Sequence, residues 1–515
     1  MDSSKLKAIL IVVLAAFGAL YLGVAAATAQ FEVVAWVLGG LVLTVCLALG
    51  RRIWLLLPFA SSLGLVLPIP GNFTTTLMAQ GLVLGFCTLL FLMRRLPIRA
   101  RFTELEFWCV LVIACVVQVY LRNPVGLNLF GGSSVGGKPY ILFGISCAVA
   151  LLLSVLHVAP GDLRWWVRLS ILGSLINFGL GAVGKLFPSI GFYLGASFST
   201  DVATANEEIA TGDASRISFV RGISITSATW LVSRISPIRA CFHPLWMPVI
   251  LFSLVAAAFS GFRSQLIIVG LTYLIGICYW NGIKGFFTSI VLGTLSLAVL
   301  AFVNLIAPLP PNVQRTLTFL PGTWEERYEK DAENSTEWRL TMWREALFTD
   351  KWIKNKWLGD GLGFSKSDLE RMQSVNAVKG GRTEMSGLTS GQENMMINGG
   401  YHSGPVTTIR TIGYVGLLVI MIGFIRLAVH AHRQIQRCRG TEWYSVSLFI
   451  GVPMIAGVLF WVFVYGDFDS ASQGILLGAA TLRLLENNLP LPAYLVRRKE
   501  PFILKKQSVH PAPTS

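Results

Sequence analysis

Ser335-Thr-Glu-Trp-Arg-Leu-Thr-Met-Trp-Arg-Glu-Ala-Leu347 lies inside a long polar stretch of this chain, residues 308–410. An apolar run ends at Ala307 before the stretch, and another begins at Thr411 after it. Structureless loops longer than about 12–15 residues are uncommon in compact proteins and are usually functional. We therefore expect residues 308–410 to be a large polar loop that carries the functional residues between two sets of hydrophobic segments.

The composition of the rest of the chain is that of a membrane protein. Of 515 residues, 54% are hydrophobic and only 13% are charged, with a mean hydropathy of +0.63. A soluble domain has about 25% charged residues. Apolar runs of about 20 residues, long enough to cross a bilayer as helices, recur along the sequence. These features predict an all-α, polytopic integral membrane protein with about 12–14 transmembrane helices.

The positive charge of the chain follows the ends of the apolar runs. The formal net charge is +15, which could suggest nucleic-acid binding. However, basic residues cluster at Arg51-Arg52, 94–101, 430–439 and 497–499, next to apolar runs. This is the positive-inside pattern of membrane proteins. We therefore expect membrane lipids as partners and no nucleic acid.

The weakly apolar stretch 217–233, which carries Arg221, decides the predicted topology. If it crosses the membrane, the basic clusters and both termini are cytoplasmic and the 308–410 loop is external, in agreement with the charge rule. If it does not cross, the loop would be cytoplasmic and the cluster at 430–439 external. We therefore count it as a crossing. The expected spans lie near 7–28, 32–50, 53–69, 74–93, 105–121, 139–157, 166–188, 217–233, 244–261, 264–281, 286–307, 411–429, 444–465 and 470–486.

This count divides the chain into four regions. Residues 1–307 hold eleven predicted transmembrane helices, and 308–410 form the external loop. Residues 411–486 hold the last three helices, and 487–515 form a basic cytoplasmic tail. The expected location is a membrane, with both termini cytoplasmic and the loop external.

Two arginines near the outer membrane boundary are candidate functional residues. Arg263 follows an apolar run, where an interfacial arginine can also simply reach toward headgroups. Arg339 lies in an expected amphipathic helix that Ser335 or Thr336 can cap. Trp343, one turn after Arg339, shares its face and can flank the guanidinium. The alternative for Arg339 is an ordinary surface ion pair.

Tyr401 and His402 stand just before Gly404-Pro405, a sequence that favours the start of a helix. His402 is then expected at a helix N-terminus at the membrane surface, a position that favours anions; a structural histidine is the alternative. The run 359–364, Gly-Asp-Gly-Leu-Gly-Phe, is explained by a tight turn, because no Gly-Lys-Ser/Thr follows it. No cluster of histidines and carboxylates has metal-ligand spacing, and the eight cysteines include no CxxC. We expect no metal and no cofactor.

These elements occur in a characteristic order. An arginine after a mid-chain span is followed by an Arg-x-x-x-Trp helix, the glycine turn, and Tyr-His before a span that reads Gly413-Tyr-Val-Gly-Leu-Leu. From about Arg263 to Leu418 this order resembles the O-antigen ligase and O-antigen polymerase superfamily of bacterial envelope proteins. The stretch Arg216…Arg221-Gly222 before a span is similar as well. Ser403 and Pro405 depart from the family pattern, which commonly has asparagine and a helix-favouring residue there.

The resemblance implies a GT-C-like, metal-independent, inverting glycosyltransferase in the bacterial cytoplasmic (inner) membrane, with the 308–410 loop facing the periplasm or exterior. Members of the family transfer a glycan from an undecaprenyl-pyrophosphate carrier to a hydroxyl of a lipid A core or of another glycan, and a chain-length regulator is a possible partner. Arg263, Arg339, Arg221 and Arg216 would bind the pyrophosphate as fixed cations. His402 would act as general base. Trp343 and Tyr401 would flank the lipid or the acceptor.

Two other functions fit a chain of this composition. A polysaccharide or lipid-linked sugar transporter, or flippase, also has twelve to fourteen spans, but such proteins often contain repeated halves and sites near the bilayer midplane. This sequence shows no repeat, and its ionisable residues concentrate in the 308–410 loop. A non-catalytic envelope protein is the third possibility, because intramembrane charges are few.

Overall fold

The computed structural model describes residues 39–66, 73–98, 102–125, 137–187, 217–363 and 390–489, less a few single positions, and three isolated residues. Helices dominate these ranges, and their only β pairing consists of isolated bridges. Eight described helices are long and apolar enough to cross a membrane. The chain is therefore an all-α, polytopic membrane protein. The predicted total of about 12–14 spans includes segments outside the described residues.

The chain divides into two compact units. The smaller unit comprises residues 1–54 and 85–96, of which the structure describes the part from residue 39 onward. The larger unit comprises residues 55–84 and 97–515, and it contains all of the described candidate site residues. Arg216, the first expected span at 7–28 and the tail beyond Leu489 lie outside the described residues.

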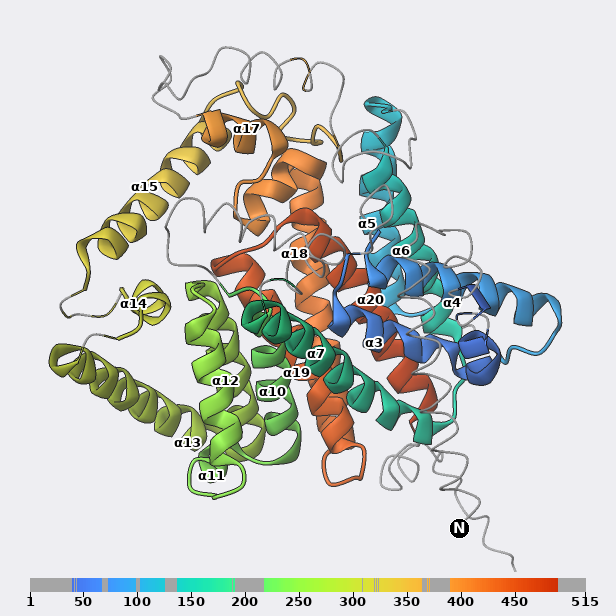
Figure 1. Ribbon diagram of the computed structural model, residues 1–515. Coiled ribbons are helices and arrows are strands. Elements are labelled where there is room, and N and C mark those ends of the chain that lie inside the picture. Colours follow the sequence, from blue (N-terminus) through green and yellow to red (C-terminus); the bar gives the residue numbers. More distant parts are fainter. Residues whose placement is uncertain are drawn as a thin grey trace, which may run out of the picture. The chain divides into compact units, whose positions relative to one another are not determined.

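Helices occupy most of the expected membrane segments (Figure 1). The helices at these segments begin and end as follows: α3 Leu56–Leu63, α4 Thr75–Leu92, α5 Glu104–Arg122, α6 Lys138–Val155, α7 Leu163–Leu186, α10 Val220–Arg234, α12 Met247–Phe259, α13 Arg263–Ile306, α18 Gly404–Cys438, α19 Tyr444–Phe463 and α20 Phe468–Asn488. Helices α11 (Pro237–Ala240), α14 (Pro311–Leu317), α15 (Glu326–Phe348) and α17 (Ser390–Asn398) and the 3-10 helices η1 (Gly50–Leu55) and η2 (Pro160–Asp162) complete the described order.

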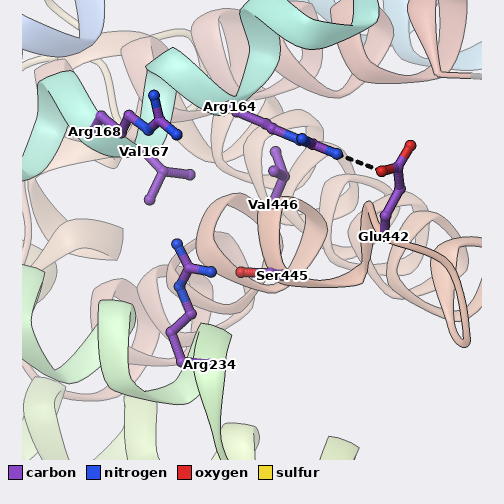
Figure 2. Close-up of a pocket in the computed structure, with 7 residues that line it drawn as sticks. All are labelled: Arg164, Val167, Arg168, Arg234, Glu442, Ser445 and Val446. Atoms are coloured by element: carbon purple, nitrogen blue, oxygen red, sulfur yellow. Dashed lines mark hydrogen bonds and ion pairs between the residues drawn. The ribbon is translucent and has the colours of Figure 1, made fainter.

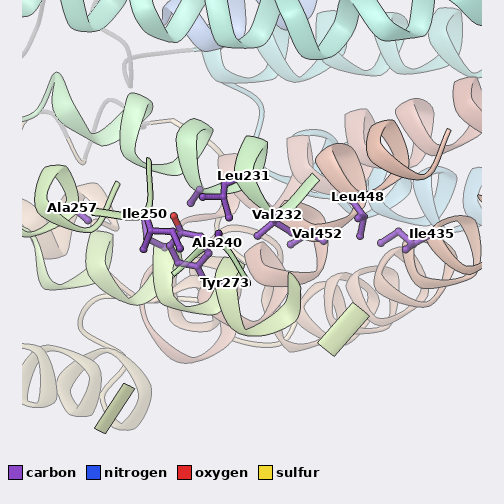
Figure 3. Close-up of a cluster of buried hydrophobic side chains, with 11 residues drawn as sticks. Leu231, Val232, Ala240, Ile250, Ala257, Tyr273, Ile435, Leu448 and Val452 are labelled. Carbon is purple, nitrogen blue, oxygen red and sulfur yellow. The ribbon is translucent and has the colours of Figure 1, made fainter. Parts of the chain in front are cut away.

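Helix α10 covers most of residues 217–233, the stretch that decides the predicted topology, and it is packed among other helices. It has only 15 residues and contacts α7, α12, α13 and α19. Ala228, Leu231 and Val232 on α10 are fully buried, in a cluster that also includes Tyr273 of α13 and Val452 of α19 (Figure 3). A helix with many polar residues is stable in an apolar setting when neighbouring helices cover it. These contacts explain why the apolar signal of residues 217–233 is weak.

Two expected spans, 264–281 and 286–307, form one helical element with a break. Helix α13 has 44 residues, which is about 66 Å of α-helix, roughly twice a hydrocarbon core. Gly282 interrupts it with φ 64° and ψ −154°. Glycine has no Cβ and adopts this conformation without steric strain.

The 308–410 loop contains helices, and one begins earlier than expected. Ser335 and Thr336 were predicted to cap a helix, but α15 begins at Glu326, so both residues lie inside it. The run 326–334 consists mostly of good helix formers, with Glu326 and Glu329 in the first turn, and this extends the helix backward. The predicted apolar face is present, since Met342 and Ala346 are completely buried.

Candidate functional site

His402 lies immediately before α18, where the chain turns into a membrane helix. Ser403 is the N-cap residue and Gly404 the first helical residue. The backbone of His402 is left-handed, with φ 49°, a conformation that is uncommon outside glycine. Its imidazole stacks on the ring of Tyr465, with centroids 5.6 Å apart and planes inclined by 28°. Strained positions of this kind occur often at functional sites.

A tryptophan explains how these two rings meet. Trp461, near the end of α19, is buried, and its Nε1 donates a hydrogen bond of 2.9 Å to the carbonyl oxygen of Asp467. A Cβ added to Gly404 or to Gly466 would overlap the Trp461 ring. The indole therefore fills the space between two glycines. Gly404 lies two residues after His402, and Gly466 directly follows Tyr465. This packing fixes the end of α19 against the start of α18.

Helix α15 is anchored to the same turn. Trp343 Nε1 donates a 2.7 Å hydrogen bond to the carbonyl oxygen of Tyr401, the residue before His402. The Tyr401 ring is fully buried, and its hydroxyl donates to the carbonyl oxygen of Met396 at 3.2 Å. In this structure Tyr401 packs inside the protein, and Trp343 positions the backbone. The expected lipid or acceptor contact of these two side chains stays a prediction.

Two arginines act electrostatically on Tyr465. Burial, the largest influence, raises the pKa of the Tyr465 phenol, as does Asp467, whereas Arg221 and Arg339 lower it. Both guanidiniums therefore lie within electrostatic range of the phenol. Arg339 is one turn before Trp343 on α15, so the anchoring of Trp343 also sets its position. With the described residues, neither arginine side chain forms an ion pair or hydrogen bond.

Arg221 is held at the start of α10 by α13. Its guanidinium lies 4.8 Å from the centroid of the Phe262 ring, a cation–π contact. Gln265 is 3% exposed, and its Nε2 donates to the carbonyl oxygen of Arg221 at 2.9 Å and to Ser224 Oγ at 2.7 Å. The buried amide thereby fixes the first turn of α10 and the direction of Arg221.

Arg263 directly follows Phe262 and begins α13. Its Nε donates a 3.4 Å hydrogen bond to the carbonyl oxygen of Arg315 on α14. Arg315 is itself only 6% exposed, and the next residue, Thr316, donates to the carbonyl oxygen of Ala258. The first helix of the long loop is therefore packed onto the turn between α12 and α13, beside Arg263.

The glycine-rich turn has a structural role in α18. Gly359, Gly361 and Gly363 all have positive φ. Helix α18 is broken at Gly413, whose φ is 76°, and a Cβ there would overlap the backbone of Trp357. Backbone hydrogen bonds join the turn to both sides of the break: Asp360 N to Arg410 O, Gly361 N to Thr411 O, Tyr414 N to Lys356 O and Val415 N to Trp357 O. The turn thus supplies partners for backbone groups that the break leaves open.

The structure brings some of the candidate residues together. His402 and Tyr465 are stacked, and Arg221 and Arg339 lie within electrostatic range of the phenol. Arg263 directly follows Phe262, whose ring contacts the Arg221 guanidinium, and Arg263 itself contacts Arg315. Sequence reasoning missed Tyr465 and Arg315. The only local signal for Tyr465 is its position at the end of an apolar run, before Gly466-Asp467.

The described residues contain no group of three or more histidine, cysteine or acidic side chains that could hold a metal ion, and all eight cysteines are free thiols. The residues that act on or stack against Tyr465 supply an imidazole, two guanidiniums and the Asp467 carboxylate. A comparison with protein-family models finds no match, and a comparison with curated proteins finds no relative. The resemblance described above rests on the sequence pattern alone.

Proposed function

We propose that the protein transfers a glycan from a polyprenyl-pyrophosphate carrier to an acceptor hydroxyl, as an O-antigen ligase-like or polymerase-like enzyme of the bacterial inner membrane. The observation that carries the proposal is the stack of His402 on Tyr465, whose phenol lies within electrostatic range of Arg221 and Arg339. The four segments that supply these residues, at α10, at α15, before α18 and after α19, lie apart in the sequence. Their convergence gives one site both a base and cations for an anionic leaving group.

The proposed mechanism assigns one task to each group. Guanidiniums bind phosphate oxygens through paired N–H groups and stay charged at all relevant pH values. Arg221 and Arg339 stabilise the negative charge that develops on the departing pyrophosphate, and Arg263 is a third candidate for this role. His402 accepts the proton of the acceptor hydroxyl as oxygen attacks the anomeric carbon. A direct displacement of this kind inverts the configuration of that carbon.

A separate apolar cavity is a candidate site for the carrier chain. A cavity of about 270 Å³ between α4 and α6 is lined by apolar side chains, including Leu77, Met78 and Ile141, together with Lys138. Helix α6 begins at Lys138, and Tyr140 Oη accepts a hydrogen bond from Leu362 N in the loop. The cavity therefore lies at the end of α6 that meets the loop. An isoprenoid chain fits a cavity of this chemistry.

A transporter remains the competing function, and the break in α18 is the feature most typical of one. In transporters, substrates or ions bind at the open backbone groups of such breaks. Here the residue 355–361 turn makes those contacts. This observation favours the transferase.

The test is acceptor-dependent release of the carrier in proteoliposomes. Purified protein is reconstituted with a glycan linked to undecaprenyl pyrophosphate, and free carrier and elongated acceptor are measured over time. Equal amounts of both products support the proposal. Movement of intact donor between leaflets without release of carrier would show a transporter instead.

The location of the site is tested separately. Glu333 is exposed on α15 and Gln436 is exposed near the end of α18. A cysteine at 333 should react with a membrane-impermeant thiol reagent in intact spheroplasts, and one at 436 only after lysis. The parent protein, with its own eight cysteines, gives the background. The reverse pattern would place the site on the cytoplasmic side.

A further inference from the structure

A second group of arginines surrounds a cavity at the other end of α10. Arg164 and Arg168 of α7, Arg234 of α10 and Glu442 and Ser445 at the start of α19 line this cavity, which has a volume of about 310 Å³ (Figure 2). Arg221 and Arg234 are 13 residues apart on one helix, which is about 20 Å along its axis. The cavity is therefore separate from the surroundings of Tyr465.

The cavity has an unbalanced positive charge. Arg164 forms an ion pair with Glu442 and lies 4.9 Å from the centroid of the Trp443 ring. Arg168 and Arg234 make no ion pair or hydrogen bond with described residues. Three guanidiniums face a single carboxylate, so about two positive charges are left over. A phosphate monoester carries about −1.5 to −2 charges near neutral pH and matches this surplus.

Backbone groups add to the attraction for an anion. Ser445 and Val446 line the cavity from the first turn of α19. The first N–H groups of a helix have no partner within the helix, and the helix dipole makes this end positive. Figure 2 shows the Arg234 side chain extending from α10 toward the α7 turn that carries Arg164 and Arg168. Side-chain and backbone donors therefore line the same space.

The position of the cavity indicates where such a phosphate comes from. Helix α7 and helix α19 are both candidate membrane spans, and both begin at the cavity. Their shared starting level is therefore a boundary between membrane and water. Trp165 is 44% exposed there, with the Arg168 guanidinium 4.8 Å from its ring centroid. Tryptophan is enriched at membrane interfaces, at the level of lipid headgroups.

We propose that this cavity binds the phosphate group of an anionic lipid headgroup, with Arg168 and Arg234 as its principal ligands. Arg164 is held in place by Glu442 and Trp443 and completes the ring of donors. Basic pockets between transmembrane helices bind lipid headgroups in this way. If the 308–410 loop is external, the cavity opens at the cytoplasmic face. The inference rests on the cavity itself and does not depend on the proposed transferase activity.

The test measures lipid retention by the full-length protein. Purified protein in detergent is titrated with phosphatidic acid, and bound lipid is counted by native mass spectrometry, with phosphatidylcholine as the zwitterionic reference. The double variant Arg168→Gln/Arg234→Gln should bind phosphatidic acid at least about tenfold more weakly. Arg433→Gln is the matched control, because Arg433 is exposed near the end of α18 and does not line the cavity. It should bind like the parent protein.

A third variant keeps the proposal testable if the double variant does not fold. Glu442→Gln removes the only acidic side chain of the cavity and leaves Arg164 free to bind phosphate, so its affinity for phosphatidic acid should rise severalfold. Unchanged or weaker binding by this variant would overturn the proposal. Equal losses of phosphatidic acid affinity in the double variant and in Arg433→Gln would also overturn the proposal. Such losses would show that binding depends on the general surface charge and not on the cavity. Displacement of the lipid by an equal concentration of inorganic phosphate would show a site for a free anion instead.

Discussion

The imidazole of His402 lies on the phenol ring of Tyr465, 5.6 Å between centroids, although 62 residues separate them in sequence (402 to 465). One ring precedes α18, and the other follows α19. Trp461 holds the two turns together by filling the space beside Gly404 and Gly466. The proposed base is thus positioned by packing between helix ends.

Gly404→Ala tests this packing. The added Cβ would overlap the Trp461 ring, and an overpacked position of this kind typically costs about 1–3 kcal/mol. We expect a lower midpoint of thermal unfolding and a large loss of transfer, because His402 moves away from Tyr465. Gly457→Ala on α19 is the control, since a Cβ there meets no atom within 4 Å. Wild-type transfer by Gly404→Ala would show that the contact is not needed.

Arg339→Lys tests the role of the guanidinium. Lysine keeps the charge but has no planar pair of N–H groups to bind phosphate. We expect transfer to fall about a hundredfold, as it does when one electrostatic donor to a transition state is lost. Arg344→Lys, an exposed arginine on the same helix, should retain activity. Equal initial rates for the two variants would remove Arg339 from the mechanism.

Asp360→Ala tests the turn that fills the break in α18. Asp360 accepts hydrogen bonds from Lys354 N at 2.8 Å and from Asn355 N at 2.9 Å. Two backbone donors lose their partner in the variant, and each such loss costs about 1–3 kcal/mol where the donor is shielded from water. Its thermal unfolding midpoint should drop clearly. Asp350→Ala, which removes an exposed ion pair with Lys356, should change it little. Similar midpoints for both variants would contradict the proposed role of the turn.

The alkaline side of the pH dependence of transfer should be flat. Burial raises the pKa of Tyr465 above its ordinary value of 10.0, so the phenol stays protonated well into the alkaline range. Initial rates should therefore stay level from neutrality to about pH 9. A loss of activity between about pH 7 and 9 would show that another group ionises in the mechanism.

The sequence predicted the helices well because an apolar run in a membrane must satisfy its own backbone hydrogen bonds. The expected spans 105–121 and 444–465 correspond closely to α5, Glu104–Arg122, and α19, Tyr444–Phe463. The break of α18 at Gly413 was not predicted, because its cause lies in hydrogen bonds to a turn more than fifty residues earlier.

Candidate residues were harder to place than helices. Arg339 and His402 were selected because they stand out in the polar loop. Tyr465 was overlooked, since an aromatic residue at the end of a span is ordinary in membrane proteins. Its contact with His402 depends on the packing of Trp461 between two glycines. No pattern within one segment of sequence contains that information. Helix α15 begins before the expected cap at Ser335-Thr336, because residues 326–334 include several good helix formers that extend it backward.

The most direct test of the proposed function compares donor binding and glycan transfer by His402→Asn. Asparagine tolerates the left-handed backbone of residue 402 but has no basic nitrogen. The variant should bind the undecaprenyl-pyrophosphate-linked donor as tightly as the parent protein, because the arginines are intact, and its single-turnover transfer should fall at least about a hundredfold. Transfer at the parental rate by a correctly folded His402→Asn protein would contradict the assignment of His402 as the base and, with it, the central claim.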